Sequence, residues 1–120
     1  MNRDKLVELY KKYDLTKDDV FKHQHYVIIT RTGIDKIQGI EQIKIEYDCI
    51  KTEPNFASLK ATATKGDAYI ETFGSALKGD NYKDGNCNSW YVAEMAEKRA
   101  MSRAVLKLTG FYELGVFGED

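Results

Sequence analysis

Alternating apolar and polar residues predict three consecutive strands in the middle of the chain. The first, at 42–52, places apolar residues on one side and charged residues on the other, and Ile50 breaks the alternation. We expect a bulge or a strand end there. The second strand is expected at 56–64, after the turn Glu53-Pro54-Asn55. The third is expected at 68–76, after the hairpin turn Lys65-Gly66-Asp67.

The longest segment with one helical period runs from Asn88 to Gly110. Asn88 or Ser89 is expected to cap its start, and Gly110 to end it. The apolar side of this helix is expected to comprise Trp90, Ala93, Met101, Ala104, Val105 and Leu108. The middle strand carries small residues on its inner side, so the helix can pack closely there. These elements predict an α+β fold, with a β-β-β-α core in which one long C-terminal helix packs on a small antiparallel sheet.

Shorter elements are expected before this core. The pattern predicts a helix over 3–13 and a second helix that starts at Thr16 and Asp19. It predicts a short strand over 25–30. A two-turn helix is then expected, capped by Thr30 or Thr32, ended by Gly39 and anchored by Ile34 and Ile37.

The chain of 120 residues is expected to form a single domain over 1–120. Its parts are an N-terminal helical segment (1–25), the core (26–110) and an aromatic tail (111–120). Phe111, Tyr112 and Phe117 of the tail are expected to pack on the core or on another subunit. The chain opens with charged residues and contains no apolar run of membrane-spanning length, so we expect a cytoplasmic protein.

Charge and composition limit the classes of function. The net charge is −1, so a polyanion site has to come from local clustering of bases and not from the overall charge. Arg99, Arg103 and Lys107 form such a cluster, because their four-residue spacing places them in one helical stripe roughly 80° wide. Two interpretations remain open. The three bases bind a polyanion, or they are solvated side chains on an ordinary surface helix.

Motifs typical of enzymes are missing from the sequence, which contains no phosphate loop, dinucleotide fingerprint or nucleophile motif. We therefore expect no enzymatic activity and no cofactor. His23 and His25 would project together from an extended segment and leave a small metal-dependent enzyme as the weakest hypothesis. Asp80, Asp84 and Glu71 are most simply solvated carboxylates.

The long helix and the elements before it resemble the single-strand DNA annealing proteins. This superfamily comprises phage recombination proteins of the Erf and RecT type and their eukaryotic counterpart. The helix signature is matched by Glu97, Arg99-Ala100 and Arg103-Ala104-Val105. Upstream, IITRTGIDKI resembles the strand and helix start of the family, and ATATKGDAYIETFGSA resembles its hairpin, so the resemblance spans about 26–110 in order.

The resemblance implies single-stranded DNA binding and strand annealing in phage-type homologous recombination or repair, without nucleotide hydrolysis. It implies a homo-oligomeric ring or filament in the cytoplasm of a bacterial host cell, and no membrane partner. A phage exonuclease and a host single-strand binding protein are candidate partners. The expected nucleic-acid-binding residues are Arg31, Lys60, Lys65, Lys98, Arg99, Arg103 and Lys107, with Tyr69 or Tyr82 available to stack on bases.

Two alternatives stay open beside that resemblance. Arg99 and Arg103 can instead be structural, pairing with Glu97 or capping backbone carbonyls within or between protomers. The chain can also be a protein-interaction or inhibitor protein on the same fold, with no DNA activity.

Overall fold

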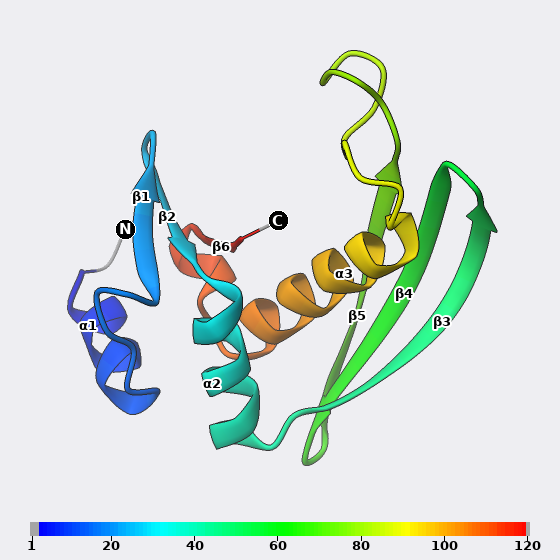
Figure 1. Ribbon diagram of the computed structural model, residues 1–120. Coiled ribbons are helices and arrows are strands. Elements are labelled where there is room, and N and C mark those ends of the chain that lie inside the picture. Colours follow the sequence, from blue (N-terminus) through cyan, green and yellow to red (C-terminus); the bar gives the residue numbers. More distant parts are fainter. Residues whose placement is uncertain (1–2, 120) are drawn as a thin grey trace.

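The computed structural model describes residues 3–119, in which α3 lies between two three-stranded sheets (Figure 1). The helices are α1 (Arg3–Lys12), α2 (Arg31–Glu41), α3 (Val92–Leu108) and the 3-10 turn η1 (Tyr112–Leu114). The strands are β1 (Val20–His23), β2 (Tyr26–Ile29), β3 (Lys44–Glu53), β4 (Phe56–Lys65), β5 (Ala68–Leu77) and β6 (Val116–Gly118). The predicted α+β class is confirmed.

The large sheet is an antiparallel meander in the order β3-β4-β5. Its register shifts between Cys49 and Lys51, which confirms the bulge expected at Ile50. Both predicted turns are confirmed. Glu53 pairs with Phe56 around a two-residue turn, and Gly66 adopts the left-handed φ of 60° in the second hairpin.

The helix α3 packs on one face of this sheet at unusually short range. Alanines line both sides of the contact and are fully buried: Ala57, Ala61 and Ala63 on the sheet, and Ala96, Ala100 and Ala104 on the helix. Thr72 Oγ1 donates a hydrogen bond of 2.6 Å to the Ala100 carbonyl oxygen. At Gly74 a Cβ atom would lie 2.2 Å from the Ala96 carbonyl oxygen and 2.5 Å from the Ala100 nitrogen, so only glycine fits there.

The second sheet was not expected from the sequence. It has the order β1-β2-β6, and β2 pairs in parallel with β6 of the tail. The helix predicted from Thr16 onward is wrong, because Val20 to His23 form β1 instead. Asp19 does not cap a helix. Its carboxylate accepts from the Thr16 nitrogen in a turn and from Lys36 Nζ at 2.7 Å.

The predicted helix ends also need correction. Thr30 caps α2 as expected, but Gly39 lies within the helix, and Gln42 takes the left-handed C-cap conformation. The N-cap of α3 is Tyr91 and neither Asn88 nor Ser89. Trp90 lies outside the helix and is 67% exposed, with Lys78 Nζ 4.9 Å from its ring centroid.

The aromatic tail packs on its own chain. Phe111 is fully buried, and its ring centroid lies 5.8 Å from that of Tyr13. Together with Ile29, Ile34, Ile37 and Val105 it forms the core between the small sheet, α2 and α3. Within residues 3–119, no helix is long and apolar enough to cross a membrane.

Candidate nucleic-acid interface

Arg99 and Arg103 reach from α3 to the free edge of β5. Arg99 donates from Nη1 to the Ser75 carbonyl oxygen at 2.8 Å and from Nη2 to the Asn86 carbonyl oxygen at 2.7 Å. Arg103 donates from Nη1 to the Phe73 carbonyl oxygen at 2.7 Å. These contacts satisfy carbonyl groups that an edge strand would otherwise leave open. Carbonyl capping, one of the structural roles considered for these arginines, is therefore present.

The same contacts leave the charge of the two arginines uncompensated. A carbonyl oxygen is a neutral acceptor, and each guanidinium has five N–H donors, of which these bonds use one or two. Among the described residues, neither arginine forms an ion pair. The predicted pairing of either arginine with Glu97 is absent from this part of the chain, and Glu97 is exposed. Capping and anion binding are thus compatible in the same side chain.

We call three cations on α3 the basic row: Arg99, Arg103 and Lys107. Each of them lines a separate hollow. Arg99 lines a hollow of about 370 Å³ beside Tyr82. Arg103 lines one of about 380 Å³ beside Tyr26 and Tyr112. Lys107 lines one of about 300 Å³, again beside Tyr112. Successive turns of α3 therefore present a cation together with at least one tyrosine.

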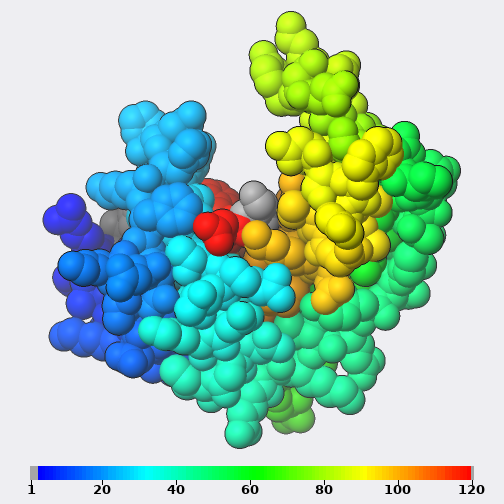
Figure 2. Space-filling model, viewed as in Figure 1, coloured from blue at the N-terminus to red at the C-terminus, as the bar shows by residue number. Residues whose placement is uncertain are grey.

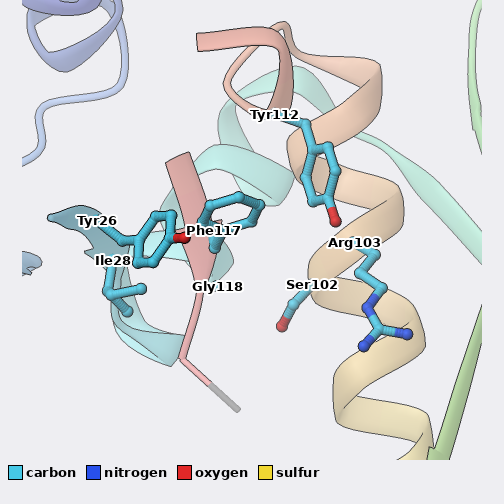
Figure 3. A pocket seen from close by; sticks show the side chains of 7 residues that line it. All are labelled: Tyr26, Ile28, Ser102, Arg103, Tyr112, Phe117 and Gly118. Carbon is cyan, nitrogen blue, oxygen red and sulfur yellow. The ribbon is translucent and has the colours of Figure 1, made fainter. Parts of the chain in front are cut away.

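The hollow at Arg103 lies between the small sheet and α3. Its walls come from β2, α3, η1 and β6. The space-filling view shows the molecular surface hollowed between the β1–β2 hairpin and the segment that leads into α3 (Figure 2). Its side chains are drawn in Figure 3. The Phe117 ring lies edge-on to Tyr26 and to Tyr112, with centroids 5.4 and 5.2 Å apart. Lys107 Nζ lies 5.1 Å from the Tyr112 centroid, so the aromatic wall joins two members of the basic row.

The remaining predicted cations lie elsewhere and, apart from Lys98, are paired with carboxylates. Arg31 Nε bonds to Asp35 at 3.3 Å at the start of α2. Lys60 Nζ bonds to Glu71 at 2.8 Å on the sheet face opposite α3. Lys65 pairs with Glu41. Lys98 is half-buried on α3 and has no ion pair within the described chain. The seven predicted residues therefore do not converge on one trough, and three of them form a row.

Glu41 is the centre of a structural cluster. Its side chain is 10% exposed, and the hydrogen bond from Lys65, together with the charges of Lys12 and Lys65, holds the pKa of the Glu41 carboxyl below its ordinary value. Burial and the neighbouring Glu41 carboxylate raise the pKa of Tyr13 to about 12. Lys65 thus fixes the β4–β5 turn to the end of α2, which accounts for its position without any ligand.

The geometry gives little support to a metal site at His23 and His25. His23 ends β1, and His25 follows Gln24, which has a left-handed φ of 57°, so the two histidines do not alternate on one extended strand as expected. Among residues 3–119, no group of three or more His, Cys, Asp or Glu side chains is placed to hold a metal ion.

The sequence did not identify the residues that complete the hollow at Arg103. The density of aromatic residues in the tail signalled that Tyr112 and Phe117 would pack, but not that they would meet Tyr26 from the other end of the chain. Nothing in the sequence distinguished Ser102, which lines the same hollow. Comparisons with protein-family models, with curated proteins and with solved structures give no match to this chain.

Proposed function

We propose that this protein binds single-stranded DNA along the basic row and anneals complementary strands as a homo-oligomer, without hydrolysing a nucleotide. By resemblance, this would serve phage-type homologous recombination or repair in the cytoplasm of a bacterial host cell. The observation that carries the proposal is the alignment of Arg99, Arg103 and Lys107. None of them forms an ion pair within residues 3–119, and each lines a hollow together with a tyrosine, although Asp80 and Glu113 also line the hollows of Arg99 and Lys107.

This arrangement suits the repeating chemistry of a nucleic acid strand. A cation at each turn of α3 can neutralise backbone phosphates and release counterions, while the tyrosines can stack on bases. Neither interaction reads base identity, so the binding would be salt-sensitive and largely indifferent to sequence. Annealing requires that property, because any pair of complementary strands has to be accepted.

A surface for self-association supports the oligomeric part of the proposal. Within the described chain, α3 is the helix that packs on the large sheet, and it covers one face. The opposite face carries Tyr69, Phe73 and Leu77, which are 66%, 56% and 38% exposed. Grouped exposed apolar residues of this kind commonly mark contacts with other proteins. We therefore take a second copy of this chain as the partner for this face.

The test is a titration of a labelled oligothymidylate in about 50 to 200 mM salt. The wild type is expected to bind with a steep negative salt slope. Arg99→Gln and Arg103→Gln are each expected to reduce that slope by about 0.7, the value for one phosphate contact on a single strand. Glutamine removes the charge and is too short to reach the carbonyl oxygens that the Nη atoms contact, so circular dichroism is measured alongside to show that the fold is retained. Annealing of complementary strands without any nucleotide completes the test.

Absence of binding at low salt would refute the proposal, as would binding that is equally strong at both salt concentrations. The second candidate, a protein-interaction or inhibitor protein on the same fold, is favoured by the exposed residues Tyr69, Phe73 and Leu77. That candidate predicts that Phe73→Ser abolishes self-association or capture of a partner, in a protein that shows no affinity for the oligonucleotide.

A further inference from the structure

The side chain of Ser102 is buried without a hydrogen-bond partner. The residue is 1% exposed, and its Oγ atom finds no donor or acceptor among the described residues. Buried polar groups in folded proteins are almost always satisfied, so each exception calls for a specific cause. Ser102 lines the hollow at Arg103, and its side chain lies directly beside Gly118, where a Cβ atom would be 3.3 Å from Ser102 Oγ (Figure 3). A molecule that enters the hollow can supply the missing partner.

The other walls of the hollow define which molecule fits. Tyr26 and Phe117 present aromatic rings, and Tyr26 is 49% exposed. Among the described lining residues, Arg103 carries the only formal charge, and it is positive. A volume of about 380 Å³ lies within the range of small-molecule sites, roughly 300 to 1,000 Å³. The hollow therefore combines a stacking surface, one buried hydroxyl group and one cation.

The geometry points to a pocket for one nucleotide unit, with the base against Tyr26 and Phe117 and hydrogen-bonded to Ser102 Oγ, and the phosphate on Arg103. The choice of ligand class rests on the proposed function, in which the unit belongs to a single strand of DNA. A free deoxynucleotide has the same chemistry. In the strand, this base leaves the stack of its neighbours, since the aromatic wall replaces them.

The first measurement uses free ligands, followed by amide chemical shifts of the protein. Deoxythymidine monophosphate and deoxyribose 5-phosphate are titrated separately. We expect shifts around Ser102 and Phe117 with the nucleotide and much weaker binding of the sugar phosphate. Tyr26→Leu is expected to weaken nucleotide binding about 5- to 100-fold, the range that stacking on one ring covers. Ser102→Ala is expected to weaken it about 5-fold, as for one hydrogen bond.

The second measurement uses oligonucleotides of equal length with normal or abasic residues. Both carry the same phosphates, so any difference in affinity reports contacts to bases. The wild type is expected to prefer the normal strand, and Tyr26→Leu and Ser102→Ala are expected to reduce that preference. Tyr91→Leu is the matched control, because Tyr91 is 71% exposed and lies outside the residues that line the hollow.

The outcomes separate this pocket from the proposed function. If oligonucleotides bind in a salt-dependent manner while both variants bind like the wild type and abasic strands bind equally well, the pocket is refuted and the function stands. If the nucleotide binds and both variants lose it while no oligonucleotide binds, the DNA function is refuted and the pocket holds free nucleotides. If the sugar phosphate and the nucleotide bind equally well, and Tyr26→Leu changes neither affinity, then the protein contacts only the phosphate. That outcome would refute the pocket.

Discussion

Two groups of cations in this molecule differ in what holds them. Arg99, Arg103 and Lys107 along the β5 side of α3 contact carbonyl oxygens or the face of a tyrosine. Arg31, Lys60 and Lys65 bond instead to carboxylates. The first group has no ion-pair partner within residues 3–119, whereas the second is paired with carboxylates of the protein.

Under the proposed function, this difference is what would let a chain with a net charge of −1 bind a polyanion. Several carboxylates of the protein form ion pairs with lysines and arginines that lie away from α3. Backbone carbonyl oxygens, which are neutral, hold the guanidinium groups of Arg99 and Arg103 in place, so their position does not depend on a neighbouring carboxylate.

The largest expected effect comes from the residue that brings the basic row to β5. Gly74→Ala places a methyl group against the backbone of Ala96 and Ala100, which cannot move aside as a side chain can. We expect a loss of stability on the order of 3 kcal/mol, the upper end for overpacking, measured by urea denaturation. The helix would shift from β5, so Arg99 and Arg103 would also lose their carbonyl contacts.

Gly39→Ala is the matched control for this prediction. Gly39 lies within α2, and a Cβ atom there would meet nothing within 4 Å. Alanine favours the helix, so the control is expected to gain about 0.5–1 kcal/mol. Equal stability of the two variants would contradict the close approach of α3 to β5.

The second prediction addresses the carboxylate-paired group through Glu41. Glu41→Gln removes the charge that binds Lys65 and Lys12 and should cost about 1–2 kcal/mol at neutral pH. Because the pKa of Glu41 is lowered in the folded protein, the unfolded chain binds its proton more readily. The contribution is therefore complete above the ordinary value of about 4.5 and is lost as the pH falls through the lower folded pKa.

Urea denaturation of both proteins across acidic pH values checks this sign. The gap between wild type and Glu41→Gln should close as the pH falls and should persist at neutral pH. A gap that widens in acid would contradict the ion-pair cluster. The variant is also expected to bind the oligonucleotide like the wild type, since Lys65 lies outside the basic row.

The large sheet and α3 could be predicted because their information is local. Alternation of apolar and polar residues predicted the three strands, with a break at Ile50, and Gly66 and Pro54-Asn55 marked their turns. The small sheet could not be predicted, because β2 and β6 pair in parallel across almost ninety residues of sequence. Val20 and Phe21 suit either a helix or a strand, and only pairing with β2 decides between them.

The candidate site divides in the same way. The four-residue spacing of Arg99, Arg103 and Lys107 predicted a common side of the helix, and they do share one. Spacing could not show that Lys60 would point to the opposite face of the sheet beside Glu71, or that Lys65 would bind Glu41. Such pairings depend on tertiary neighbours, which a single sequence does not record.

The smallest expected effect is on DNA binding. It compares one lysine of the basic row with one lysine of the carboxylate-paired group. Lys107→Gln removes one charge from the basic row, while Lys60→Gln removes one that Glu71 already neutralises on the opposite sheet face. Loss of one phosphate contact should lower the salt slope of oligonucleotide binding by about 0.7, the single-strand value, and weaken binding a few-fold at low salt. Lys107→Gln should show this decrease, and Lys60→Gln should leave the slope unchanged.

Both side chains lie on the surface, so thermal unfolding should remain close to that of the wild type. Equal slopes for the two variants would mean that total charge, and not the basic row, attracts the strand.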